Sequence, residues 1–145
     1  MPRTTSSGKT VYSVDMMLAY INIFKPKAHV IKLSDIHMDL DAKGWGESNI
    51  SVNDVLANKK KYAADYNRIK SADLSYPIII NSKYEICDGV HRYVKAMMLK
   101  KKTINAYVFD NKLMKKFIIN KTGKYDVKME TNEYIELFNK LFKNL

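Results

Sequence analysis

The pattern of apolar and polar positions changes period twice between residues 76 and 110, and this stretch sets the expected architecture. Three consecutive isoleucines after Pro77 are typical of a short buried strand, because β-branched side chains favour extended backbone. A polar turn and a second extended segment follow and end at Cys87. From His91 onward apolar residues recur at helical spacing, and residues 103–109 alternate again. The predicted order is strand, turn, strand, polar corner, helix and strand.

Amphipathic segments flank this stretch on both sides. Ser13 is a good N-cap for the first of them. Ser51 and Asp54 form a capping box with a shorter acid than usual, which predicts the start of a second helix. Thr131 caps a third helix, whose apolar stripe suits docking on the sheet or on a second copy of the chain and leaves a homodimer open. The predicted helices cover residues 11–24, 51–70 and 131–145, and a predicted strand covers residues 29–33.

Chain length sets the scale of the fold. A chain of 145 residues corresponds to one domain, which can bury roughly two-thirds of its unfolded surface in a single core. The first residues are small and polar, so residues 1–10 are expected to form a disordered tail. Residues 11–145 are expected to form one α+β domain, a small mixed sheet flanked by helices with an added helix at each end.

The polar corner gathers five residues with binding chemistry, Asp88-Gly89-Val90-His91-Arg92. A helix that begins near Val90 directs its free backbone N–H groups and the positive end of its dipole at the corner. Gly89 lets a ligand approach the backbone closely. Together with the side chains of His91 and Arg92, these donors predict a phosphate-binding site.

The same residues carry a resemblance to a known family. The string PIII, followed by YEICDGVHRYVKAM and a second apolar strand, resembles the nucleotide-binding core of the ParB/sulfiredoxin superfamily. This group includes chromosome-partitioning proteins, sulfiredoxins, free serine kinases and ParB-like proteins linked to DNA modification, and it often carries DG-x-HR or a close variant at this corner. The likeness covers roughly residues 29–110.

The resemblance implies a site for ATP or CTP, with Mg²⁺ as an optional companion. By that likeness His91 and Arg92 contact the phosphates, and Gly89 opens the phosphate-binding turn that continues into Val90. Asp88 is then the acid at the site.

The helix before the isoleucine strand lends further basic groups to the phosphates in this superfamily. The matching candidates are Lys60 or Lys61, together with Arg68. A run of lysines on a helix is more often a solvated face, so both interpretations stand.

One departure from the family pattern excludes an activity. Sulfiredoxin has its reactive cysteine immediately before the His-Arg pair, and Val90 occupies that position here. Cys87 lies three residues earlier, on a predicted strand. Sulfinic acid reduction is therefore rejected.

Charge and cysteine content limit the expected partners and the expected cellular compartment. A net charge of +10 predicts anionic partners, although a lysine-rich composition can also serve solubility alone. A single cysteine excludes an internal disulfide, and no apolar run is long enough for a membrane span, so an intracellular protein is expected. His29 and His37 have no companions at ligand spacing, and no metal site is predicted from them.

A glycine-bracketed loop around Trp45 allows two interpretations. The favoured one is an exposed loop with Trp45 against the core. The other is a lid, in which Trp45 stacks on a base and Asp39, Asp41 or Glu47 assists a metal.

Residues 95–128 hold ten lysines against Asp110 and Asp126. If half of these lysines share one face, that face could follow a nucleic-acid backbone. Tyr107, Phe117 and Tyr125 add stacking surfaces, although such aromatic residues more often fill a core.

Three functions follow from these observations. The first is a nucleotide hydrolase or phosphoryl transferase, in which His91 and Arg92 neutralise charge on the phosphate. Asp88, preferred over Glu85, would position a nucleophile or Mg²⁺, and it could equally be a helix cap. The second is a DNA-binding or DNA-nicking module that uses the same corner. The third is a family member that binds a ligand or partner without catalysis.

Overall fold

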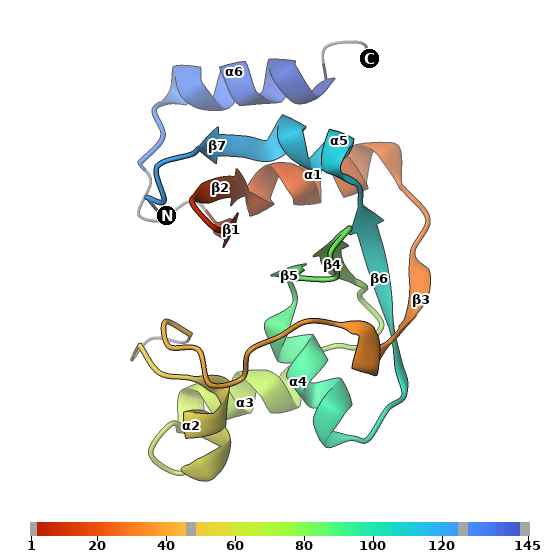
Figure 1. Ribbon diagram of the computed structural model, residues 1–145, viewed down its shortest axis with the longest axis vertical. Helices are drawn as coiled ribbons and strands as arrows, with labels where there is room; N and C mark the ends of the chain where they lie inside the picture. The colour runs from red at the N-terminus through yellow and green to blue at the C-terminus, as the bar shows by residue number, and fades with distance from the viewer. Residues whose placement is uncertain (1–2, 46–48, 125–127, 143–145) are drawn as a thin grey trace.

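A four-stranded mixed sheet lies at the centre of the molecule (Figure 1). The computed structural model describes residues 3–45, 49–124 and 128–142. The strand order is β3-β6-β4-β5, in which β4 runs parallel to β6 and the other two pairs are antiparallel. The prediction of an α+β fold with a small mixed sheet flanked by helices is confirmed. These strands are β3 (His29–Lys32), β6 (Thr103–Phe109), β4 (Ile78–Asn81) and β5 (Ile86–Asp88).

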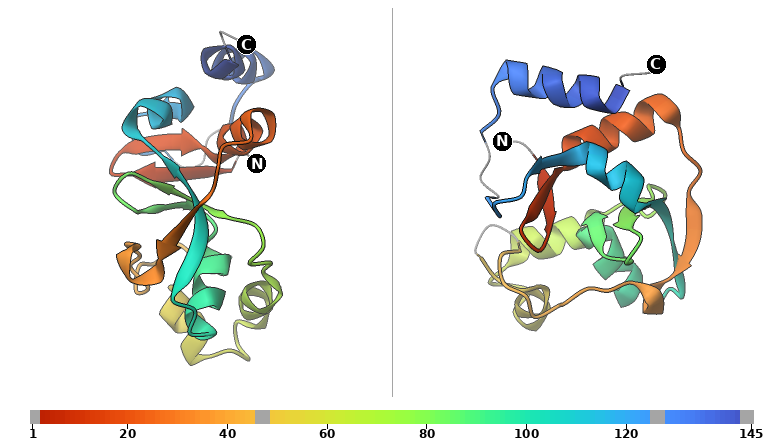
Figure 2. Two further views of the ribbon diagram at one scale, coloured as in Figure 1. Left: turned by 90° about the vertical axis from the view of Figure 1, so that its right-hand side faces the viewer. Right: turned by 45° about the horizontal axis from the view of Figure 1, so that its top comes forward.

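Six α-helices surround the strands in the described part of the chain, on both sides of the central sheet (Figures 1 and 2). Among these residues no helix is both long and apolar enough to cross a bilayer. The helices are α1 (Val14–Phe24), α2 (Val52–Ala57), α3 (Ala63–Ser71), α4 (Val90–Met98), α5 (Asn111–Met114) and α6 (Thr131–Phe142), with short 3-10 turns η1 (Leu33–Asp35) and η2 (Lys115–Phe117).

Residues 4–10 contradict the prediction of a disordered tail over residues 1–10, of which residues 1 and 2 lie outside the described part of the chain. Strands β1 (Thr4–Ser7) and β2 (Thr10–Ser13) form a hairpin, and β7 (Ile118–Asn120) pairs with β2 to make a second, antiparallel sheet. Gly8 turns the chain with φ of +60°, a conformation that glycine adopts at little cost. The hairpin is ordered because Val11 is fully buried and the Arg3 carbonyl accepts a 2.9 Å hydrogen bond from Val14 N–H.

The expected helix over residues 51–70 is two helices instead of one. The predicted capping box at Ser51 and Asp54 is confirmed, since each side chain accepts from the other residue's backbone N–H. The helix ends because Asn58 leaves helical geometry, with φ of −141° and ψ of 71°, and its side chain accepts from the Lys61 N–H at 3.3 Å. Asparagine competes for backbone groups in this way, which favours turns over helix interiors.

The other predicted helices differ from the structure mainly at their ends. Ser13 caps α1 as predicted, but residues 11–13 belong to β2. α6 docks against α1 and η2 through Leu137, Leu141 and Phe142, while residues 143–145 lie outside the described part of the chain.

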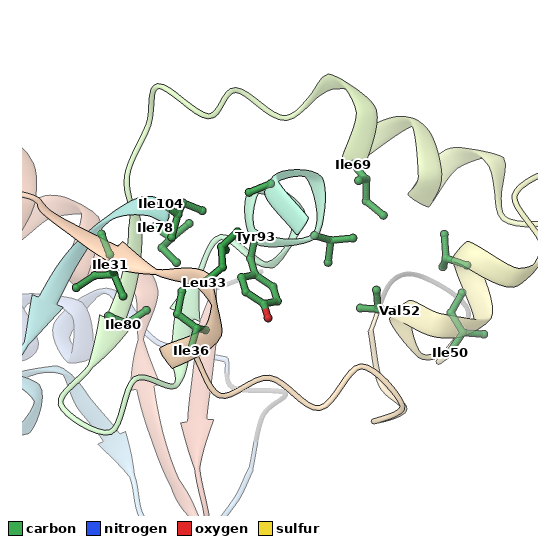
Figure 3. Close-up of a cluster of buried hydrophobic side chains, with 14 residues drawn as sticks. Ile31, Leu33, Ile36, Ile50, Val52, Ile69, Ile78, Ile80, Tyr93 and Ile104 are labelled. Carbon is green, nitrogen blue, oxygen red and sulfur yellow. The ribbon is translucent and has the colours of Figure 1, made fainter. Parts of the chain in front are cut away.

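Strand β4 is buried on both faces and separates two hydrophobic clusters. Ile78 and Ile80 point into the cluster beneath α3 and α4, where they meet Ile104 of β6 (Figure 3). Ile79 points the other way, into the cluster formed with α1, η2 and α6. Successive side chains of a strand alternate between faces, so the three isoleucines supply both clusters. The C-terminal end of β5 and the N-terminal end of α4 meet beside this strand, at the predicted polar corner.

Candidate functional site

The corner between β5 and α4 requires glycine. Gly89 is the N-cap of α4, with φ of +112° and ψ of 29°. A Cβ atom added there would lie 2.5 Å from Cγ2 of Ile78, closer than carbon atoms can pack. The absence of a side chain therefore lets α4 start directly against β4, with its first N–H groups at the corner, as the sequence predicts.

The carboxylate of Asp88 is held by two guanidinium groups. Arg3 donates from Nη2 to Oδ1 at 2.7 Å, and Arg92 donates from Nη2 to Oδ2 at 3.1 Å. Asp88 and Arg92 side chains are 14% and 19% exposed, so water screens this pair only partly. Asp88 does not cap α4, because the helix has no side-chain cap. That interpretation is corrected: the carboxylate forms ion pairs instead.

Arg92 spans the corner and is largely occupied by the protein itself. Its Nη1 donates to the backbone carbonyls of Pro77 at 2.7 Å and Tyr76 at 3.2 Å, while Nη2 binds Asp88. These bonds tie the start of β4 to α4. The guanidinium thus mainly stabilises the contact between the start of β4 and α4. It has fewer N–H groups left for a ligand than the sequence suggests.

The imidazole of His91 lies between a loop and helix α3. The Trp45 ring packs against it with ring centroids 5.0 Å apart. Burial and the positive charge of Arg68 lower the pKa of His91, against the opposing effect of the Asp65 and Asp88 carboxylates. The ring is accordingly neutral at pH 7 in the free protein.

A cavity of about 560 Å³ opens beside the corner, and it brings together four of the predicted site residues: Asp88, His91, Arg92 and Arg68. Lys60 and Lys61 do not line it, because they lie exposed in the turn between α2 and α3. The remaining lining residues are Arg3, Leu18, Ile21, Ser71, Ala72, Asp73, Tyr76, Pro77, Ile79 and Tyr107.

Gly89 and Val90 shape the corner without lining the cavity. Gly89 is in contact with Ile78, and Val90 packs against the cluster beneath α4. Glu85 lies elsewhere, where it accepts hydrogen bonds from Asn81 at 2.8 Å and Ser7 at 3.2 Å. The preference for Asp88 over Glu85 as the acid at the corner agrees with this geometry.

Sequence reasoning missed Arg3 and the apolar wall of the cavity. Arg3 belongs to the segment assigned to a tail, and its partner Asp88 is 85 positions away. Leu18 and Ile21 carry only a helical repeat, which does not say what the helix faces. No local pattern in the sequence marks these residues as neighbours of the corner.

Trp45 lies where the favoured loop interpretation puts it, partly buried against the core and against His91. Asp39 and Asp41 are tied locally: Asp39 accepts from the Asp41 N–H at 3.0 Å, and Asp41 accepts from Asn53 at 2.8 Å. Glu47 lies outside the described residues. Within the described ranges, no group of three or more histidine, cysteine or acidic residues is arranged to hold a metal ion.

Cys87 is buried in the cluster on the α1 side of the sheet. Burial, followed by the charges of Glu85 and Asp88, raises the pKa of its thiol to about 12. A thiol that stays protonated at neutral pH is a poor nucleophile.

The described lysines of residues 95–128 include two groups at opposite ends of β6. Lys100–Lys102 precede β6, whereas Lys112, Lys115 and Lys116 follow its other end in α5 and η2 (Figure 1). A seven-residue strand separates these groups by roughly 20 Å. Phe117 is fully buried and offers no stacking surface, whereas Tyr107 lines the cavity, and Tyr125 and Asp126 lie outside the described residues.

Comparison with known proteins does not identify the family of this chain. No family model matches the chain, and no curated protein matches it. A search of solved structures finds the ParB-N domain of a Pnob8-like protein, with a TM-score of 0.32 and 18% sequence identity. The match covers 79% of this chain and 43% of that one. A superposition at this level leaves the family of the chain open and carries no argument about ligand or activity.

Proposed function

We propose that this chain binds a nucleotide, ATP or CTP, in the cavity beside α4. The observation that carries the proposal is the composition of that cavity: basic groups and a helix N-terminus meet an apolar wall around a volume of about 560 Å³. Ligand sites of this kind commonly enclose about 300–1,000 Å³. A nucleotide matches both the basic and the apolar half of this cavity, because it joins an anionic phosphate chain to a flat, largely apolar base.

The phosphates would lie at the basic half. Arg68 and Arg3 line it with side chains 50% and 57% exposed, so both can turn toward an anion. The N–H groups at the start of α4 add donors and a favourable dipole. His91 adds a positive charge once it is protonated, and Arg92 holds the corner in shape.

The base would lie at the apolar half, which α1 and the segment before β4 provide. Leu18 and Ile21 line it from α1, and Tyr107 lines it from β6. Tyr76 is 66% exposed although it is a large aromatic residue. An exposed ring at the edge of a cavity suits stacking on a base.

Hydrolysis or phosphoryl transfer, the further part of the proposal, depends on Asp88. Both of its carboxylate oxygens are paired with guanidinium groups in the free protein. Asp88 could bind Mg²⁺ together with the ligand's phosphates only after Arg3 moves to those phosphates. Turnover is therefore expected only where nucleotide binding separates Arg3 from Asp88, and binding without turnover supports a non-catalytic member of the family.

Calorimetric titration of the full chain with ATP and CTP, with and without Mg²⁺, tests the proposal. Arg68→Gln should weaken binding about tenfold or more, because a charge-assisted hydrogen bond contributes about 1.5–3 kcal/mol. Lys61→Gln is the matched control, since it removes the same charge from the exposed turn outside the cavity. Equal losses in both variants, or no saturable binding of either nucleotide, would refute the proposal.

Binding to a DNA backbone is the competing function, and the exposed lysines at both ends of β6 favour it. It predicts an affinity that falls steeply with salt and depends on many lysines rather than on Arg68. Mobility-shift titrations of a short duplex at two salt concentrations separate the two functions.

A further inference from the structure

One wall of the cavity beside α4 is formed by a continuous stretch of chain, from the last turn of α3 to the start of β4. Arg68 and Ser71 are three residues apart in α3 and both line the cavity, so they lie on the same side of the helix. The chain leaves the helix at Ala72, and Asp73 and Tyr76 line the cavity from the turn that follows. Along this wall a guanidinium is therefore followed by a hydroxyl, a carboxylate and an aromatic ring.

The turn after α3 brings Asp73 and Tyr76 close together. The Tyr76 N–H donates to the Asp73 carbonyl at 3.3 Å, which closes a four-residue turn. The Cα atoms of the first and last residues of such a turn lie within about 7 Å of each other. The Asp73 carboxylate also accepts from the Ser75 N–H at 2.9 Å, which orients the side chain. The carboxylate is thus a near neighbour of the ring on which the proposed function places the base.

Both ends of this turn are attached to α4. Before the turn, Lys95 Nζ donates to the Ala72 carbonyl at 2.7 Å. After it, Arg92 Nη1 donates to the carbonyls of Tyr76 at 3.2 Å and Pro77 at 2.7 Å. Hydrogen bonds from charged donors are stronger than those between neutral groups. Two cationic side chains of one helix therefore hold the segment in place, and a ligand that enters the cavity meets a preformed wall.

The Asp73 carboxylate is exposed and charged. Hydrogen bonds from Ser75 and, less strongly, the charge of Lys95 lower the pKa of Asp73, so the group is ionised at pH 7 and can only accept hydrogen bonds. Among the described residues Asp73 forms no ion pair, whereas both oxygens of Asp88 bind guanidinium groups. Asp73 would repel a phosphate, but an ionised carboxylate has about four acceptor sites and can take a further neutral donor. A hydroxyl group is such a donor.

We infer that Asp73 is a specificity-determining residue that accepts hydrogen bonds from the ribose hydroxyls, the 2′-hydroxyl among them, so that the cavity takes ribonucleotides in preference to 2′-deoxyribonucleotides. This inference rests on the proposed function, which assigns the phosphates to the Arg68 end of the wall and the base to the Tyr76 end. Asp73 lies between these two residues in the chain, as the sugar lies between the phosphates and the base in a nucleotide. An acidic side chain also binds the ribose 2′-hydroxyl in dinucleotide-binding folds.

Calorimetric titration of the full chain with ATP and dATP, and with CTP and dCTP, tests the inference, because the members of each pair differ only in the 2′-hydroxyl. The wild-type chain should bind the ribonucleotide about tenfold more tightly than its deoxy counterpart, since the hydrogen bond that is lost has a charged acceptor. Asp73→Ala should lose this preference by weakening the binding of the ribonucleotide. A loosened turn would weaken both members of a pair alike, so the ratio of their affinities reports on the hydrogen bond and not on the turn.

Asp39→Ala is the matched control. Asp39 is also exposed and accepts from the N–H two residues further on, that of Asp41 at 3.0 Å, but it does not line this cavity. This variant should keep the wild-type ratio, and Arg68→Gln should weaken both members of a pair alike. Equal affinity of the wild-type chain for both members, or an unchanged ratio in Asp73→Ala, would overturn the inference and leave the proposed function intact. Failure of the wild-type chain to bind any of the four nucleotides would refute both.

Discussion

Replacing Gly89 with alanine disturbs the corner in two ways that the structure separates. The first is backbone strain, because φ of +112° is a conformation that L-residues with a Cβ rarely adopt. The second is a collision, because the new Cβ would lie 2.5 Å from Cγ2 and 2.9 Å from Cβ of Ile78. Ile78 is fully buried on the central strand and has no free space to retreat into.

The expected loss of stability follows from these two terms. A left-handed backbone costs an alanine about 1–2 kcal/mol, and overpacking a dense core costs about 1–3 kcal/mol. Together they give about 2–5 kcal/mol, a large part of the 5–15 kcal/mol that usually stabilises a domain. In urea, where unfolding free energy typically falls by about 1–3 kcal/mol per molar, the midpoint should decrease by about 1–2 M.

Gly8→Ala is the matched control for this experiment. Gly8 also has a positive φ, +60°, but an added Cβ would meet nothing within 4 Å. It should therefore show the strain term alone, about 1–2 kcal/mol. The double variant Gly89→Ala/Ile78→Ala should lose less than the sum of its single variants, because Cγ2 is gone. If Gly89→Ala shifts the midpoint no more than Gly8→Ala, the close packing of β4 against α4 is wrong.

Three further predictions concern single groups. Asp88→Asn should destabilise the protein by about 1–3 kcal/mol in denaturant titrations, because it removes the partner of two guanidinium groups, and Arg3→Gln should cost less since Arg3 is half exposed; equal losses would contradict this. Cys87 should resist a thiol reagent in the native protein and react on unfolding, since its pKa is raised to about 12; rapid native labelling would refute its burial. In the folded protein the pKa of His91 is below 6.5, its ordinary value. Below that pH the unfolded chain therefore binds more protons than the folded protein, so the free energy of unfolding should fall as pH decreases from about 6.5 toward the folded pKa. His91→Gln should remove that part of the decrease.

Local patterns predicted the elements whose residues interact with their sequence neighbours. The isoleucines of β4 and the glycine before α4 specify a strand and a helix start directly, and Ser51 with Asp54 specifies a cap. The helix break after Ala57 was missed because Asn58 acts through a side-chain bond that a helical repeat does not reveal.

Long-range contacts account for the rest of what the sequence could not predict. The order of the N-terminal hairpin depends on β7, more than 100 positions away, and the Arg3 ion pair joins segments 85 positions apart. Lys60 and Lys61 were chosen for their charge, whereas the turn carries them away from the cavity. Charge alone does not tell which basic residues lie at the cavity. Of Lys60, Lys61 and Arg68, only Arg68 lines it.

The division of the three β4 isoleucines between two cores has a consequence for how the molecule can come apart. Ile79 cannot leave its cluster without withdrawing Ile78 and Ile80 from theirs, since adjacent residues of one strand move together. The layer that holds α3 and α4 and the layer that holds α1 and α6 therefore both depend on strand β4. Loss of order on either side spreads to the other, and the cavity beside α4 exists only while both are intact.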